Sequence, residues 1–157
     1  MSRDLEEAVS EFVEQMGLHA EAEGLPRTAG RIMGLMLVCE GPYTLDELQE
    51  ELQISRGSAS TNTRRLEELG VAERTTRPGD RKVYYRLTDD PYGRIVESRL
   101  ERMRKIQELV DRSIEEIPDD YEKGKRRLDY MRQFYQLIVE ETDALIREWR
   151  ERDVQLE

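Results

Sequence analysis

The stretch that decides the fold is SRGSASTNTRRLEELGVAERTTRPGDRKVYYRL, residues 55–87. This basic segment carries eight basic and four acidic residues, a local charge of +4, in a chain whose formal net charge is −10. Its basic residues are Arg56, Arg64, Arg65, Arg74, Arg77, Arg81, Lys82 and Arg86. A positive island in an acidic chain indicates a face that meets a polyanion.

The basic segment predicts a helix followed by a β-hairpin. Ser55 is a favourable N-cap and Gly70 a favourable terminator, so we expect a helix between them. The β-prone runs VAERTT and KVYYRL follow, separated by RPGD at residues 77–80, where Pro-Gly suits the centre of a type II turn. Side chains alternate along a strand. We therefore expect one side of the second strand to carry Val83, Tyr85 and Leu87, and the other to carry Lys82, Tyr84 and Arg86.

Three more helices are expected before the basic segment. Residues 4–23 carry one apolar stripe at helical spacing, made of Leu5, Val9, Phe12 and Met16. The next helix has Ile32, Leu35, Met36 and Cys39 among its apolar positions, and Gly41-Pro42 ends it. The third begins in TLDE at residues 44–47, a capping box in which a threonine and a glutamate satisfy each other's backbone N–H groups.

Helical periodicity returns from Pro91 onward. One apolar stripe ends at Pro118 and consists of Val96, Leu100, Met103, Ile106, Val110, Ile114 and Ile117. A second stripe consists of Leu128, Met131, Tyr135, Ile138, Leu145 and Trp149. The stripes at the two ends of the chain have no expected partner in the small middle domain, which favours a dimerisation platform.

These elements predict a mainly α fold with a small β-hairpin wing, a winged helix-turn-helix flanked by long dimerisation helices. We expect an N-terminal dimerisation helix at residues 1–24, the winged domain at residues 25–90, and C-terminal dimerisation helices at residues 91–157. The 157-residue chain is 37% hydrophobic and 38% charged, which suits long amphipathic helices that bury their stripes against a second copy.

The predicted helix of the basic segment has two faces. On a helical wheel, the side expected to pack inward carries Ala59, Asn62, Thr63, Leu66 and Leu69. The opposite side carries a small residue, short hydroxyls and an arginine fork, which suit close entry into a DNA major groove. Its Arg64 can donate twice to guanine, whereas Arg56 suits a phosphate and the hairpin tip suits a minor groove. We predict DNA contacts by Arg56, Gly57, Ser58, Ser60, Thr61, Arg64, Arg65, Arg77, Arg81 and Lys82.

Composition and motifs argue against an enzyme, a metalloprotein and a membrane protein. The chain has no nucleophile–base pair, phosphate-binding glycine loop or metal-ligand spacing, so we expect no enzyme, no catalytic residue, no cofactor and no metal site. One cysteine and one histidine make a zinc site of the usual ligands improbable. No signal-peptide core and no run of membrane-span length is present, so a cytoplasmic protein that does not bind membranes is expected.

Three pieces of the sequence resemble the MarR superfamily of winged-helix regulators, and more closely its GbsR-like branch. They are GLPRTAGRIMGLMLVC at residues 24–39, TLDELQEELQISRGSASTNTRRLEELG at residues 44–70, and RPGDRKVYYRL at residues 77–87 with Asp90 and Tyr92 beyond. The run SRGSAS followed by Asn62 and Arg64 is the most specific part. The resemblance implies a homodimer that binds double-stranded operator DNA, usually as a repressor, and responds to a small molecule such as choline or a related osmolyte.

Two questions stay open at the level of sequence. Tyr43 and Tyr92 flank the domain junctions, and we predict that they bind the effector, because ring faces attract a quaternary ammonium. The alternative function is a winged-helix protein–protein interaction module without sequence-specific DNA binding. An exposed apolar patch on the helix that begins after Ser55 would favour that alternative.

Overall fold

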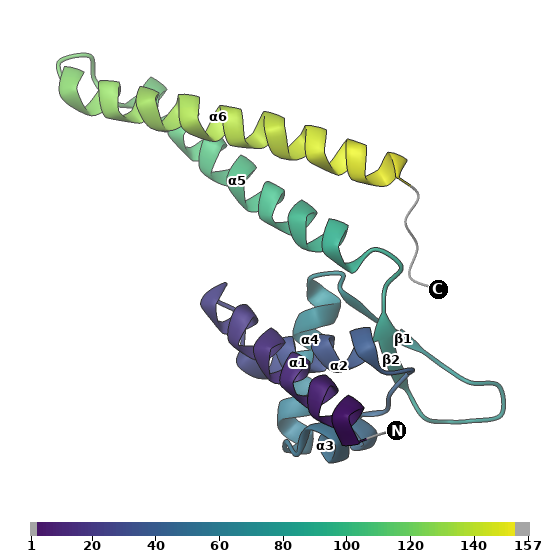
Figure 1. Cartoon of the computed structure of the whole chain (residues 1–157). Coiled ribbons are helices and arrows are strands. Elements are labelled where there is room, and N and C mark those ends of the chain that lie inside the picture. Colours follow the sequence, from purple (N-terminus) through teal and green to yellow (C-terminus); the bar gives the residue numbers. More distant parts are fainter. Residues whose placement is uncertain (1–2, 153–157) are drawn as a thin grey trace. The chain divides into compact units, whose positions relative to one another are not determined.

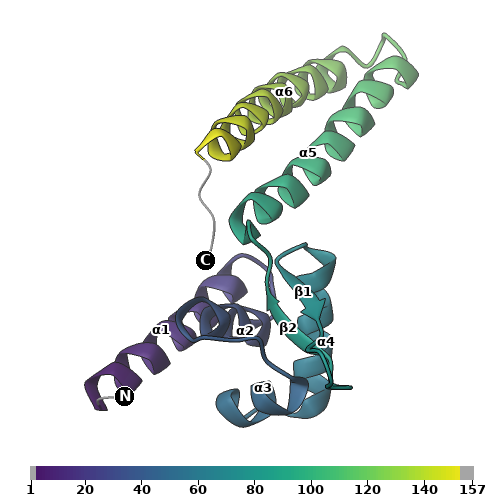
Figure 2. The same ribbon diagram turned by 90° about the vertical axis from the view of Figure 1, so that its right-hand side faces the viewer.

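The computed structural model describes residues 3–152, which form two compact units (Figures 1 and 2). The first unit ends at Pro91 and the second begins at Tyr92. The first contains α1 (Arg3–Ala22), α2 (Arg27–Val38), α3 (Leu45–Leu52), α4 (Arg56–Glu68), β1 (Ala72–Thr75) and β2 (Tyr84–Leu87). The second contains α5 (Pro91–Glu116) apart from its first residue, and α6 (Glu122–Glu151). The mainly α architecture with a two-stranded wing is confirmed.

Local signals fix the ends of α3 and α4. The Thr44 hydroxyl accepts from the Glu47 N–H at 3.2 Å, and the Glu47 carboxylate accepts from the Thr44 N–H at 2.6 Å, so the capping box is present. Ser55 caps α4 by accepting from the Ser58 N–H at 3.1 Å. Gly70, two residues beyond the end of α4, has a positive φ of 69°, a conformation that costs a glycine little.

The core of the first unit lies between α2, α3, α4 and the wing. Ile32 of α2 and Leu48 of α3 are completely buried, and Leu66 of α4 is 2% exposed. Asn62 and Thr63 are buried polar residues on the same side of α4, and their side chains donate to the carbonyls of Ser58 and Ala59 within the helix. This core holds α4 with one face inward and the other toward solvent.

Helix α1 packs against α2, which corrects the prediction that the N-terminal stripe has no partner within its own chain. The contact uses small residues: a Cβ added to Gly30 would lie 2.4 Å from the Met16 carbonyl and 2.5 Å from the Ala20 Cβ. The large residues Leu5 and Phe12 of the predicted stripe stay 49% and 38% exposed. The pattern of large apolar residues therefore missed a close crossing in which Met16 and Ala20 of α1 meet the glycines Gly30 and Gly34 of α2.

The wing is an antiparallel pair in which Ala72 faces Leu87 and Thr75 faces Tyr84. Its turn is as predicted, since Gly79 has φ of 80° and the Asp80 N–H donates to the Arg77 carbonyl at 3.0 Å.

The two sides of the second strand are not divided into one buried and one exposed side. Tyr84 and Tyr85 are 5% and 6% exposed although they are neighbours, and Val83, just before β2, is 44% exposed. The cause is the turn of the wing, because Asp80 accepts from the Tyr84 hydroxyl at 2.7 Å and the Arg77 guanidinium covers the Tyr84 ring at 4.3 Å.

The second unit is an antiparallel helical hairpin. Arg104 of α5 pairs with Asp143 of α6 at 2.5 Å, and Glu97 of α5 pairs with Arg150 of α6. Its buried apolar residues are Leu100, Val110 and Ile146. A separate face of α6 exposes a second apolar stripe, which consists of Tyr130, Phe134, Leu137 and Leu145. Across residues 3–152, none of the helices has the length and apolar character needed to span a membrane.

Candidate nucleic-acid interface

Helix α4 presents the face that the sequence predicted. Ala59, Asn62, Thr63 and Leu66 are buried, and Leu69 just beyond the helix is half-buried. The opposite side is open to solvent: Gly57, Thr61, Arg64 and Arg65 are exposed, and Ser58 and Ser60 beside them are half-buried. Small and basic residues follow one another along the exposed side of α4. Their size allows close approach to a groove of duplex DNA, and their charge complements its phosphates.

Gly57 is not required by the chain's own packing. A Cβ built there would meet only the Ser55 hydroxyl oxygen, at 3.9 Å, and the residue lies in a regular helix. Glycine costs a helix roughly 0.5–1 kcal/mol relative to alanine. The space beside Gly57 is therefore open to a molecule that approaches α4 from outside.

The basic residues divide into a paired and an unpaired set. Arg65 pairs with Glu68 at 3.3 Å, Arg74 with Glu67 at 2.8 Å, Arg86 with Glu73 at 2.6 Å, and Arg56 with Asp46. Within the basic segment, residues 55–87, four exposed cations form no ion pair: Arg64, Arg77, Arg81 and Lys82. All four belong to the predicted DNA contacts, one on α4 and three on the wing. We call these four the unpaired cations.

Asp80 accepts two hydrogen bonds at the wing tip. Its carboxylate accepts from the Tyr84 hydroxyl at 2.7 Å and from the Lys82 N–H at 2.9 Å. These hydrogen bonds, the tyrosine's first, lower the pKa of Asp80. The Arg77 guanidinium stacks on the Tyr84 ring, which orders the side chain without neutralising its charge.

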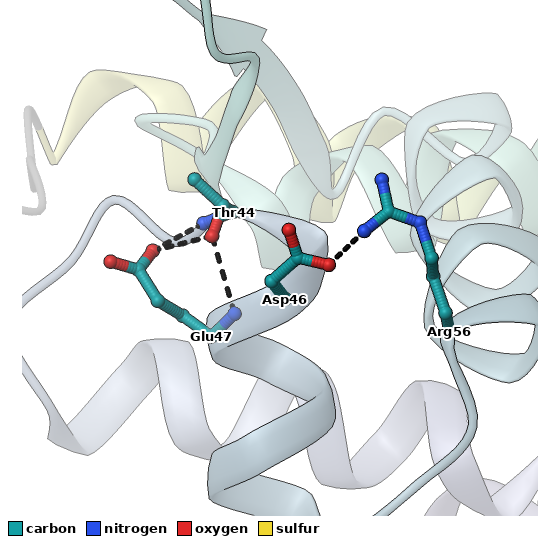
Figure 3. Close-up of polar contacts among 4 residues, drawn as sticks. All are labelled: Thr44, Asp46, Glu47 and Arg56. Carbon is teal, nitrogen blue, oxygen red and sulfur yellow. Dashed lines mark hydrogen bonds and ion pairs between the residues drawn. The ribbon is translucent and has the colours of Figure 1, made fainter.

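Arg56 joins α4 to the start of α3 (Figure 3). Its Nη1 contacts the Asp46 Oδ1, and both side chains are largely exposed. Beside them Glu47 completes the capping box, and the hydrogen bond from the Thr44 N–H is the main reason that its pKa is lowered. Asp46 and Arg56 also line a pocket of about 270 Å³ with Lys82 of the wing.

The two tyrosines predicted to bind an effector have different surroundings. Tyr43 extends the wing, because its backbone forms an antiparallel bridge with Tyr85, and burial raises the pKa of its hydroxyl to about 12. Tyr92 lies in the helical hairpin, where it lines a pocket of about 300 Å³ with Trp149 and four small or aliphatic residues, Gly93, Val96, Leu145 and Ile146.

Comparison with known proteins identifies the fold's family. A model of the MarR family matches residues 23–82, and a model of the MmpR5-like MarR family transcriptional regulators matches residues 90–152. The HTH-type transcriptional regulator MmpR5 of Mycobacterium tuberculosis is 38% identical over 79% of this chain and 76% of its own length. This chain belongs to the MarR family. It is therefore a winged-helix, DNA-binding transcriptional regulator and not an enzyme.

Other relatives agree with this assignment. The HTH-type transcriptional repressor GbsR of Bacillus subtilis is 37% identical over 52% of this MarR-family chain and 41% of its own length. A crystal structure described as a transcriptional regulator has 32% identity and a TM-score of 0.78, covering 92% of this chain and 99% of that one. The predicted MarR and GbsR-like resemblance is confirmed, and the C-terminal helices add a likeness to MmpR5 that the sequence reading did not include.

The sequence did not predict a role at these sites for two residues, Trp149 and Asp46. Trp149 belongs to a predicted apolar stripe, and it lies beside Tyr92 because α6 runs back antiparallel to α5. Asp46 was read only as part of the TLDE motif, and the turn between α3 and α4 brings it to Arg56. The spacing of residues along the chain predicts neither the Trp149–Tyr92 pair nor the Asp46–Arg56 pair, because each pair forms where two helices meet.

Proposed function

We propose that this MarR-family chain is a homodimeric, cytoplasmic repressor that binds operator DNA with α4 and the wing, and that a small effector changes its affinity. The observation that carries the proposal is the set of four unpaired cations, Arg64, Arg77, Arg81 and Lys82. Exposed cations without a carboxylate partner can neutralise phosphates without first breaking an internal ion pair.

The exposed face of α4 fits direct reading of bases. In this proposal Arg64 enters the major groove and donates to guanine O6 and N7, with Gly57 allowing close approach. The wing cations contact phosphates or the minor groove beside it. A protein-docking role for α4 has less support, because none of its exposed residues is a large apolar one.

The apolar stripe of α6 supports the homodimer. Tyr130 is 77% exposed, and Phe134 and Leu137 are 54% and 55% exposed, a spacing that repeats along one helix face. A second copy that covers this stripe would remove it from water. Leu5 and Phe12 of α1 provide further exposed apolar surface for the same purpose. Two α4 helices would then read successive major grooves, roughly 34 Å apart, on a near-palindromic site.

The pocket at Tyr92 supports an effector site. Tyr92 and Trp149 supply two aromatic rings, and the lining residues include no charged side chain. A quaternary ammonium has no N–H to donate, so ring faces and apolar walls suit it, at about 0.5–2 kcal/mol per ring. Choline or a related osmolyte is the proposed class. Tyr43 stays a proposed contributor on the grounds of sequence alone.

Selection from random duplexes tests the DNA-binding part. We expect enrichment of a near-palindromic site, and fluorescence anisotropy across a salt series should then compare it with random DNA. Arg77→Ala and Arg81→Ala should weaken both duplexes similarly and make the log–log salt slope shallower by about one unit each. A selection that enriches no sequence would leave a protein-docking module as the better account.

Calorimetric titration tests the effector part. We expect heat on addition of choline or glycine betaine, lost in Tyr92→Ala and in Trp149→Ala, and a change in operator affinity when the compound is present. A tenfold change needs only about 1.4 kcal/mol of coupling. No heat and an unchanged affinity would overturn the effector proposal while leaving the DNA-binding proposal intact.

A further inference from the structure

Two carboxylates on the first turn of α3 lie beside the basic segment and have different partners (Figure 3). Glu47 accepts from the Thr44 N–H at 2.6 Å and from its hydroxyl at 2.9 Å, so this carboxylate is occupied by the helix cap. Asp46 stands outside the capping box and pairs with Arg56 instead. The side chains of Asp46 and Arg56 are 64% and 62% exposed, so an external anion can reach the pair.

The Arg56–Asp46 pair differs from the other three ion pairs of the basic segment because its acid lies outside that segment. Arg65, Arg74 and Arg86 take their acids from within the basic segment, at Glu68, Glu67 and Glu73 respectively. Arg56 takes its acid from α3. The pocket of about 270 Å³ at this point is lined by two cations, Arg56 and Lys82, and by one carboxylate, that of Asp46, together with Thr44, Leu45, Val83 and Tyr85.

We propose that Asp46 is a built-in competitor for DNA phosphate at Arg56. It holds the guanidinium while no DNA is bound and releases it to a backbone phosphate in the complex. The inference rests on the DNA-binding function proposed above and adds a residue that limits affinity rather than one that supplies it. Because both side chains are largely exposed, the pair is weak, and a phosphate can displace the carboxylate.

Counterion release gives the competition a measurable signature. Each phosphate neutralised by a protein cation contributes about 0.9 to the log–log slope of affinity against salt. When Arg56 leaves Asp46, the freed carboxylate attracts a cation from solution, which offsets the one released from the phosphate. Removing the Asp46 charge removes that offset. The effect applies to any sequence, because phosphate contacts carry no sequence information.

The experiment measures fluorescence anisotropy from 50 to 200 mM salt on random and selected duplexes. It compares the full-length chain with Asp46→Asn, Arg56→Ala and the double variant. Glu11→Gln, on an exposed position of α1, removes one charge elsewhere on the same unit and is the control. We expect Asp46→Asn to bind both duplexes about fivefold more tightly at 50 mM salt, with a slope steeper by about one unit. The slope change should disappear in the Arg56→Ala background.

Several results would overturn the inference. Weaker binding by Asp46→Asn would mean that the carboxylate buttresses Arg56 toward the phosphate. An equal gain in Glu11→Gln, or the same slope change with and without Arg56, would mean that only total charge matters. Thermal melting of each variant checks that the fold is kept, and Asp46→Ser gives a second replacement if asparagine alters the helix start. Because random DNA suffices, the inference stands or falls even if no operator sequence is enriched, whereas no DNA binding at all would overturn both proposals.

Discussion

Helix α4 of the winged unit and helix α6 of the hairpin differ in the kind of residue that they expose. In the winged unit Ile32 and Leu48 are fully buried, and the exposed residues of α4 are small or polar. In the hairpin Tyr130 is 77% exposed and Phe134 is 54% exposed. The first unit encloses a core of its own. The second exposes an apolar stripe on α6, and in the proposed function the first unit reads DNA while this stripe forms the dimer.

The largest expected effect is on the core of the winged unit. Leu48→Ala should lower the free energy of unfolding by about 2–5 kcal/mol, because it removes a fully buried side chain and leaves a cavity. Urea denaturation followed by circular dichroism measures it. Leu109→Ala, at an exposed position of α5, is the matched control and should change stability by less than about 0.5 kcal/mol. Equal losses in both variants would break the comparison.

The next effect concerns assembly by the hairpin. Phe134→Asp should raise the dimer dissociation constant at least about tenfold, since it places a charge in the proposed apolar interface. Sedimentation equilibrium measures this directly. Gln136→Asp adds the same charge on the opposite side of α6 and should have little effect. A wild-type chain that stays monomeric at micromolar concentration would contradict the role given to the stripe.

How far the sequence could predict this structure depends on the kind of signal. The caps at Thr44 and Ser55 and the turn at Gly79 were predicted because the interactions involved are local. The inward face of α4 was predicted because period and burial agree. The α1–α2 crossing was missed because the α2 side of the close approach is formed by Gly30 and Gly34, which a pattern of large apolar residues does not mark. The burial of Tyr84 was missed because a cation–π contact within the wing, not strand alternation, covers its ring.

The candidate site was likewise only partly predictable from the sequence. The positive charge of the basic segment was visible in the sequence, but which cations are free of carboxylates was not. Arg64 and Arg65 are neighbours in sequence, yet only Arg65 lies beside Glu68 in an ion pair. The Tyr92–Trp149 pocket depends on the return of a helix across more than fifty residues.

A smaller effect with two opposite signs is expected at Gly57. Gly57→Ala should stabilise the winged unit by up to about 1 kcal/mol, because alanine favours the helix and the added Cβ meets open space. The same change should weaken operator binding, because it fills the gap that the DNA is proposed to use. Thermal melting and anisotropy on one protein preparation test both signs. Gly124→Ala, at a glycine of α6 where an added Cβ also meets open space, is the control. Unchanged operator affinity would exclude a close approach at Gly57.

The smallest expected effect is on the acid stability of the winged unit. The pKa of Glu47 is lowered in the folded chain, so its contribution is present above the usual value of 4.5 and is lost as the pH falls through the folded pKa. Glu47→Gln should therefore cost up to about 1 kcal/mol near pH 7 and make the loss of stability below pH 4.5 less steep. Urea denaturation from pH 3 to 7 measures it, with Glu50→Gln as control. Parallel curves for wild type and Glu47→Gln would mean that the cap is not linked to protonation.

The central claim is that the exposed face of α4 reads DNA sequence, and Arg64→Ala tests it most directly. Anisotropy should be measured for the selected operator and for random DNA of equal length, at one fixed salt concentration. The account predicts a loss of about 1–3 kcal/mol on the operator and a much smaller loss on random DNA, so that discrimination between the two collapses. An Arg64→Ala variant that keeps its full preference for the operator would contradict the account.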